Sequence, residues 1–148
     1  MPIFGLTVER LLKMGIEPFE ILLPAVDHLR DEIEQMSRSW LVKPTLVFGE
    51  EAKLAAFRTA RAALAASGTV TLELALSGIP MVVAYQVSFF AGQLRHVIRV
   101  PSIVLPNLIL GRNVIPEHIQ SECNPVQLAN SLLPLLNKTN ETCKCCHV

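Results

Sequence analysis

The sequence has little aspartate, no net charge and no long apolar run, and each shortage excludes a class of protein. Only two aspartates occur, Asp27 and Asp31, so the chain lacks the clustered aspartates that a phosphorylated receiver domain needs at its strand ends. The 13 basic side chains balance the 13 acidic ones, which gives no sign of a nucleic-acid partner. No apolar run approaches the roughly 18–20 residues of a membrane-spanning helix.

A secretion signal and a metal-binding spacing are missing as well. The first residues lack the basic start, apolar middle and small-residue cleavage site of a signal peptide, so we expect a cytoplasmic protein. Three of the four cysteines, Cys143, Cys145 and Cys146, crowd into the tail. Zinc sites usually separate paired thiolates by about two to four residues, and adjacent cysteines can hardly bind one ion together. We therefore expect no metal and no other cofactor.

The sequence does contain apolar strands that alternate with helices. Apolar residues make up 51% of its 148 residues, enough for one domain with a sizeable core. The pattern predicts strands at 19–25, 44–49, 61–66 and 81–85, and helices at 2–14, 26–37, 50–60, 69–77, 88–99 and 125–136. The stretch 102–111 is expected to be extended and interrupted by Pro106. Continuously apolar strands are typical of a parallel sheet covered by helices on both faces, so we predict an α/β fold.

The turn Ser67-Gly68-Thr69 lies between a predicted buried strand and a predicted helix. The first N–H groups of such a helix lack internal partners, glycine lets a ligand approach the backbone, and the helix dipole attracts anions. Glu73 follows one helical turn after Thr69 and could accept two hydrogen bonds from a diol such as a ribose. These residues predict a phosphate-binding turn with a ribose clamp. The alternative is an ordinary capped helix with an exposed glutamate.

Two longer blocks make this prediction more specific. ASGTVTLE at 66–73 and LPNLILGR at 105–112, in this order and spacing, resemble lipid-A-disaccharide synthase. LLPAV at 22–26 and NPVQLANSLLPLL at 124–136 fit the same family. The family joins two acylated glucosamine units. It transfers 2,3-diacylglucosamine from its UDP ester to 2,3-diacylglucosamine 1-phosphate and releases UDP, in the biosynthesis of lipid A.

The resemblance implies a GT-B glycosyltransferase, which has two Rossmann-like domains with the active site in the cleft between them. Residues 1–136 would be part of the C-terminal domain, a Rossmann-like parallel sheet with helices on both faces that binds the UDP-sugar donor. The family has a whole N-terminal domain before this segment and then a strand that ends in a Gly-Ser-Arg phosphate loop. We expect a fragment that lacks the acceptor site and general base with them, followed by an atypical cysteine-rich tail at 137–148.

The resemblance also implies a substrate site of eight residues, which are Ser67, Gly68, Thr69, Glu73, Asn107, Arg112, Glu117 and Gln120. The serine-glycine-threonine turn would face the diphosphate, and Glu73 would face the ribose. Arg112 would neutralise diphosphate charge beside Asn107, and Glu117 and Gln120 would line the same cleft. In the alternative interpretation, Asn107 only holds a turn and Arg112 is a surface charge.

The acylated substrates imply work at a membrane surface. Residues 88–100 place an apolar stripe beside Arg95 and Arg99, which share a helix face. Such a helix suits an anionic lipid surface, although a core-facing helix with a basic edge would look the same. We therefore expect a peripheral contact with the inner face of the inner membrane.

The expected partners are the UDP-diacylglucosamine donor and the acylated glucosamine 1-phosphate acceptor, with no nucleic acid, and two copies could form a homodimer. Two alternatives to the transferase stay open. A UDP-sugar epimerase-like GT-B domain would share the S-G-T turn and glutamate of 67–73 but lack the block at 105–112. An inactive nucleotide-binding remnant is the other alternative.

Overall fold

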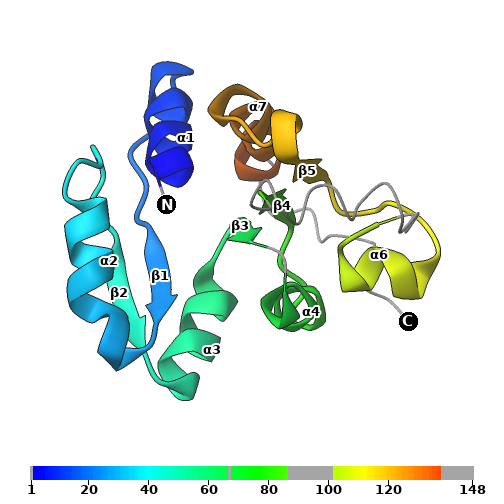
Figure 1. Cartoon of the computed structure of the whole chain (residues 1–148), viewed down its shortest axis with the longest axis horizontal. Helices are drawn as coiled ribbons and strands as arrows, with labels where there is room; N and C mark the ends of the chain where they lie inside the picture. The colour runs from blue at the N-terminus through cyan, green and yellow to red at the C-terminus, as the bar shows by residue number, and fades with distance from the viewer. Residues whose placement is uncertain (1, 67, 87–101, 138–148) are drawn as a thin grey trace.

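The computed structural model describes residues 2–66, 68–86 and 102–137 (Figure 1). In chain order the elements are α1 (Pro2–Lys13), β1 (Leu22–Ala25), the 3-10 helix η1 (Asp27–Leu29), α2 (Arg30–Ser37), β2 (Thr45–Phe48), α3 (Glu50–Thr59), β3 (Ala63–Ala66), α4 (Thr69–Leu76), β4 (Met81–Tyr85), α6 (Leu105–Leu110), β5 (Glu117–Ile119), the 3-10 helix η3 (Gln120–Glu122) and α7 (Pro125–Asn137). Ser67, the predicted helix at 88–99 and the cysteine-rich end of the tail lie outside the described residues.

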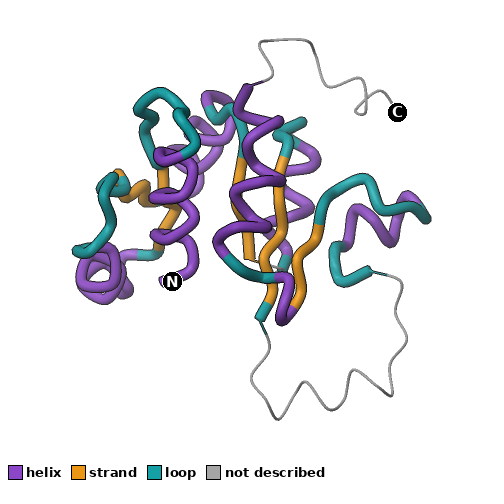
Figure 2. Tube along the Cα trace, turned by 90° about the horizontal axis from the view of Figure 1, so that it is seen from above, coloured by secondary structure: helices purple, strands orange, loops and turns teal. Residues whose placement is uncertain are grey.

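In the described part of the chain, all strands are parallel and form two separate sheets. β1 pairs with β2, and β4 lies between β3 and β5. The two groups of strands lie apart in both ribbon views (Figures 1 and 2). Helices connect successive strands, α3 between β2 and β3 and α4 between β3 and β4, because parallel neighbours cannot be joined by a tight turn. The predicted parallel α/β class is confirmed.

The core of the larger sheet lies on both faces of β4. Its alternate side chains point to opposite faces, as the strand period of two requires. On one face Val82 packs with Leu11 of α1 and Leu128 of α7. On the other face Val83 packs with Leu74 of α4. Both valines are fully buried, and each such burial contributes about 1.5–3 kcal/mol.

Most of the predicted helices and strands occur within a few residues of their expected ends, but the region after residue 102 differs. The extended conformation expected for 102–111 is wrong, because Leu105–Leu110 form α6. Pro106 lies in the first turn of this helix, where its missing N–H has no partner to lose. The short strand β5 was not expected either, since Glu117, His118 and Ile119 have no apolar run. No helix in the described ranges is long and apolar enough to cross a bilayer.

Helix α1 links the two halves of the molecule. It packs along α7, which covers the larger sheet, and it also contacts the helix α2 beside the smaller one. Gly5 of α1 lies against the indole of Trp40, just after α2, so closely that a Cβ built there would be 2.5 Å from Trp40 Nε1. Trp40 is itself buried. Only glycine allows this contact.

We predict that Gly5→Ala destabilises the chain by about 1–3 kcal/mol, because the added methyl group must displace a buried indole. At a helix position with free space around it, the same change would stabilise the chain by about 0.5–1 kcal/mol. The sign of the change in the free energy of unfolding therefore shows whether Gly5 contacts Trp40. Urea unfolding would measure it. The control is Leu6→Ala, at an exposed position of the same helix, which should change stability by less than about 0.5 kcal/mol. A stabilised Gly5→Ala variant would contradict this packing.

Candidate functional site

The turn between β3 and α4 brings an exposed backbone to the carboxyl edge of the larger sheet. Gly68 has a φ of +148°, a conformation that side chains rarely adopt, and a Cβ built there meets no atom within 4 Å. Its carbonyl accepts a 2.7 Å hydrogen bond from the Thr71 hydroxyl, and Thr71 is buried. Thr69, the first residue of α4, is exposed. The backbone of Gly68 and the first residue of α4 are therefore open to a ligand, and the hydrogen bond from Thr71 fixes the position of Gly68.

Glu73 is held by a lysine from the preceding helix. Lys53 Nζ lies 2.8 Å from Glu73 Oε2 and 2.9 Å from Glu50 Oε1. The hydrogen bonds to Glu73 and Glu50 raise the pKa of Lys53 above its ordinary value, which keeps the ammonium charged. Since the ammonium contacts Oε2, Oε1 of Glu73 keeps its acceptor sites for a ligand.

Sequence reasoning missed Lys53 and Thr71. For Lys53, the signal was Glu50 three residues before it on a predicted helix, an i,i+3 spacing that pairs charges. For Thr71, the signal was its position two residues after the start of the predicted helix, from which a threonine hydroxyl can reach the carbonyl of Gly68.

Asn107 is buried in α6 and uses both ends of its amide. Its Oδ1 accepts hydrogen bonds from the N–H groups of Val114 and Ile115 at 3.0 and 2.9 Å, and its Nδ2 donates to the Ile115 carbonyl at 2.9 Å. These contacts hold the loop that follows Gly111, as the alternative interpretation of Asn107 expects. Arg112, in that loop, is exposed.

Glu117 and Gln120 lie at either end of β5. The Glu117 carboxylate accepts a hydrogen bond from the Ile103 N–H at 3.0 Å and one from the Ser102 hydroxyl at 3.2 Å. It thus ties β5 to the segment before α6. Gln120 follows the carboxyl end of β5 with a φ of +54°, at the edge of the sheet that also carries Gly68.

The structure thus divides the predicted residues into two groups. Gly68, Thr69 and Glu73 belong to α4 and the turn before it. The second group, in the segment 102–120, consists of Asn107, Arg112, Glu117 and Gln120. Ser67 lies outside the described residues. The helices of the two groups, α4 and α6, pack against each other, so the groups lie on neighbouring elements. No described cluster of three or more His, Cys, Asp or Glu residues could hold a metal ion.

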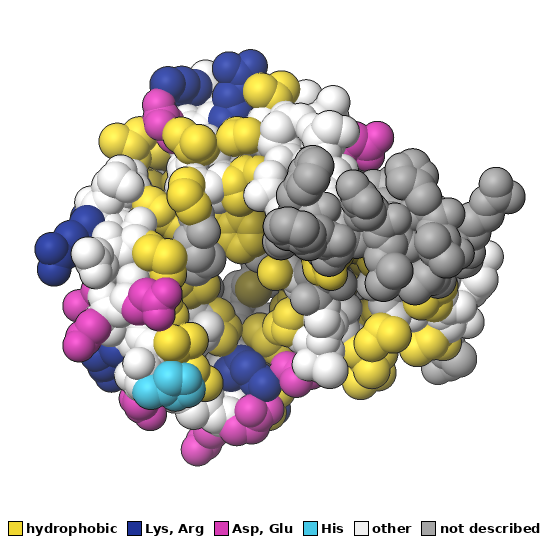
Figure 3. Space-filling view, in the orientation of Figure 1, with side chains coloured by type: hydrophobic (Ala, Val, Ile, Leu, Met, Phe, Trp, Pro, Cys, Tyr) yellow, Lys and Arg dark blue, Asp and Glu magenta, His cyan; other side chains and the backbone are white. Residues whose placement is uncertain are grey.

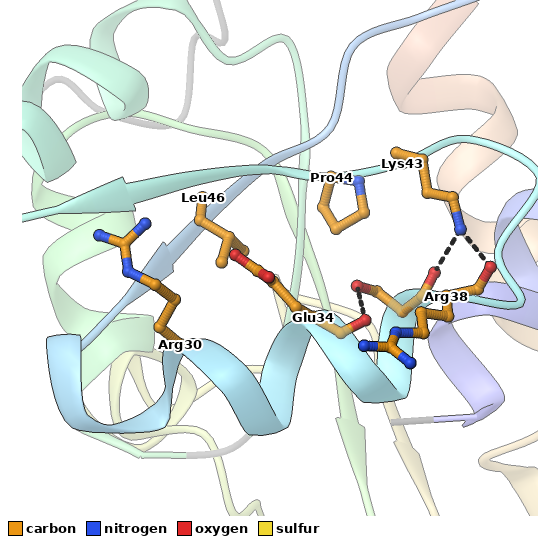
Figure 4. Close-up of a pocket in the computed structure, with 7 residues that line it drawn as sticks. Arg30, Glu34, Arg38, Lys43, Pro44 and Leu46 are labelled. Carbon is orange, nitrogen blue, oxygen red and sulfur yellow. Dashed lines mark hydrogen bonds between the residues drawn. The ribbon is translucent and has the colours of Figure 1, made fainter.

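A cavity of about 440 Å³ lies elsewhere, beside α2 and the start of β2 (Figure 4). Its lining consists of Arg30, Glu34, Ser37, Arg38, Lys43, Pro44 and Leu46. The Lys43 ammonium donates hydrogen bonds to the carbonyls of Ser37, the last residue of α2, and of Arg38 just after it, so its charge is engaged within the chain. None of the seven predicted site residues that the structure describes lines this cavity.

Parallel strands joined by helices, with a glycine turn and a helix start at a strand's carboxyl end, define a Rossmann-like α/β protein. Sequence comparison then identifies the family. The family model described as "Lipid-A-disaccharide synthetase" matches residues 2–147, and the chain belongs to this family.

Individual relatives agree with the family match. The chain is 50% identical over 139 residues to the lipid-A-disaccharide synthase of Bradyrhizobium diazoefficiens, covering 93% of the chain and 35% of the relative. It is 50% identical over 137 residues to that of Nitrobacter winogradskyi, covering 92% and 34%. It is 48% identical over 140 residues to that of Rhodopseudomonas palustris, covering 94% and 35%. The chain therefore spans about a third of the length of the curated relatives it matches.

We predict that Asn107→Ala lowers the free energy of unfolding by about 2–4 kcal/mol, because it removes three hydrogen bonds worth about 1 kcal/mol each. Urea unfolding of parent and variant would measure the loss. Asn113→Ala is the matched control, since Asn113 is an exposed asparagine of the same loop and should change stability by less than about 0.5 kcal/mol. Equal stabilities of the two variants would show that Asn107 does not hold the loop.

Proposed function

We propose that the chain carries the UDP-binding part of a glycosyltransferase that makes lipid A disaccharide. The whole protein would transfer 2,3-diacylglucosamine from its UDP ester to 2,3-diacylglucosamine 1-phosphate and release UDP. The family match over residues 2–147 supports this most strongly, since the matched region includes both motif blocks. A UDP-sugar epimerase would share the block at 66–73 but not the one at 105–112, so the match favours the transferase.

In this proposal the start of α4 binds the diphosphate. The first N–H groups of a helix point out of its end and the dipole favours negative charge there. The open side of Gly68 lets phosphate oxygens reach the backbone, and Thr69 adds a hydroxyl. The exposed guanidinium of Arg112 would offset charge on the departing diphosphate, which an inverting transfer must stabilise.

Glu73 would bind the ribose through Oε1, while Lys53 holds Oε2. A carboxylate offers about four acceptor sites, so one ammonium leaves room for two ribose hydroxyls. Glu117 and Gln120 would line the cleft on the side of β5. None of the eight residues is proposed as the general base.

The protein would act in the cytoplasm, with a peripheral contact on the inner face of the inner membrane, because its donor and acceptor are both acylated. The sequence of residues 88–100 supports this contact through its apolar stripe and paired arginines. The acylated acceptor, the homodimer and the absence of a nucleic-acid partner stay predictions from the sequence.

We predict weak UDP binding by the chain, with a dissociation constant on the order of 1 mM, about 4 kcal/mol. Titration with UDP should shift the amide resonances of Gly68 and Thr69 first. Glu73→Ala should abolish detectable binding, because hydrogen bonds to a charged group are worth roughly 1.5–3 kcal/mol each. Glu73→Gln, which keeps one acceptor oxygen, should bind more weakly than the parent but better than Glu73→Ala.

Glu51→Ala is the control, since Glu51 is exposed in the first turn of α3 and is not among the proposed ligands. It should bind UDP like the parent. The ribose assignment would be wrong if Glu73→Ala kept the parent affinity, or if UDP shifted resonances away from the start of α4.

A further inference from the structure

The cavity of about 440 Å³ beside α2 lies apart from the residues proposed to bind UDP. Its walls come from α2 and from the segment 43–46, at the start of β2 (Figure 4). Pockets that hold small organic ligands span about 300–1,000 Å³, so this cavity has room for such a ligand. The proposed function makes no use of it.

The walls of the cavity carry an excess of positive charge, although the chain has no net charge. Arg30, Arg38 and Lys43 contribute three positive charges, and Glu34 contributes the only negative charge among the lining residues. Lys and Arg side chains reach the surface on the side of the molecule that α2 forms (Figure 3). An excess of cations around a cavity attracts anions.

Lys43 compensates the carbonyls at the end of α2, which would otherwise repel an anion. The last carbonyls of a helix carry partial negative charge. The Lys43 ammonium donates hydrogen bonds to the carbonyls of Ser37 and Arg38, and the Ser37 carbonyl also accepts a 3.0 Å hydrogen bond from the Trp40 N–H. An ammonium has three N–H donors, so one of them is left for a ligand.

Arg30 is held in place by an aromatic ring. Its guanidinium carbon lies 3.9 Å from the centroid of the Phe48 ring, which is a cation–π contact. Its ion pair with Asp27 is long, at 3.7 Å, and both side chains are exposed, so the pair contributes little. A guanidinium has five N–H donors in a fixed plane, and most of those of Arg30 remain for a ligand.

Glu34 and Arg38 have no side-chain partner in the part of the chain that the structure describes. Glu34 lies four residues from each arginine of the cavity, a spacing that commonly pairs opposite charges on a helix. Yet it forms an ion pair with neither. Figure 4 shows the side chains of Arg30 and Glu34 extending from α2 toward the side of β2. Two cations and a carboxylate thus line one cavity without neutralising one another.

We propose that this cavity binds the phosphate ester of a small hydroxylated molecule. The three cations would bind the phosphate, because a guanidinium can donate two parallel hydrogen bonds to phosphate oxygens and an ammonium adds a point charge. Glu34 would repel a bare phosphate but would accept a hydrogen bond from a hydroxyl group of the ligand. Pro44 and Leu46 would contact the carbon skeleton of the ligand.

The first experiment titrates the chain with glycerol 3-phosphate, which carries a phosphate and hydroxyl groups. We expect the amide resonances of residues 38–46 to shift and those of Gly68 and Thr69 to stay unchanged. Trp40 is the only tryptophan, so its fluorescence should follow the same binding curve. Sodium chloride at equal ionic strength is the control. Equal shifts in chloride, or shifts confined to Gly68 and Thr69, would overturn the proposal, and neither result would bear on UDP binding.

Arg38→Gln tests the role of the cations. It should weaken binding of glycerol 3-phosphate about tenfold, because charge-assisted hydrogen bonds are lost. Urea unfolding should show the stability of the parent, since the Arg38 side chain has no partner in the described residues. Arg58→Gln is the matched control, because Arg58 is exposed in the last turn of α3 and does not line the cavity. Equal affinities of the two variants would contradict the proposal.

Glu34→Ala tests the hydroxyl contact. The parent should bind glycerol 3-phosphate more tightly than inorganic phosphate. The variant should bind inorganic phosphate about threefold more tightly than the parent does, because a repulsive charge is gone, but should no longer prefer the ester. A variant that keeps this preference, or one that binds neither ligand, would contradict the proposed role of Glu34 and overturn the proposal.

Vesicles distinguish the two sources of such a phosphate, a free metabolite and a lipid head group. Phosphatidylcholine vesicles with and without phosphatidylglycerol would be sedimented with the parent and with Arg38→Gln. Co-sedimentation that requires both phosphatidylglycerol and Arg38 would support the proposal with a lipid head group as ligand. Binding of glycerol 3-phosphate without such co-sedimentation would support it with a free phosphate ester. The absence of both would overturn it.

Discussion

The burial of Val82 and Val83 on opposite faces of β4 is the interaction on which the rest of the structure depends. β4 pairs with a strand on each side and packs against α1 and α7 on one face and α4 on the other. The packing of α4 fixes where its first turn lies, and the pairing of β5 fixes Gln120. The geometry of the candidate site is therefore a consequence of one buried strand. A substitution that opened a cavity at either valine would disturb both groups of site residues together.

The sequence predicts those helices and strands whose own residues specify them, and it fails for those that depend on contacts with distant residues. β4 was predicted with its observed ends, because MVVAY is apolar throughout and follows a Gly-Ile-Pro break. α6 was not, since Pro106 stands both in extended segments and in the first turn of a helix, and only tertiary packing separates these cases. β5 has three residues without a strand-like composition. Its existence depends on pairing with β4, which no local pattern records.

The candidate site shows the same limit. The glycine of the turn was predictable because Gly68 adopts a conformation that the residue type itself favours. The partners of polar side chains were not, because a hydrogen bond between distant residues leaves no trace in a single sequence. Lys53 contacts Glu73 from twenty residues away, and Glu117 contacts Ile103 from fourteen. Both carboxylates were predicted as ligand groups. The structure shows that each already has a partner inside the chain: Glu73 contacts Lys53 of α3, and Glu117 ties β5 to the segment before α6.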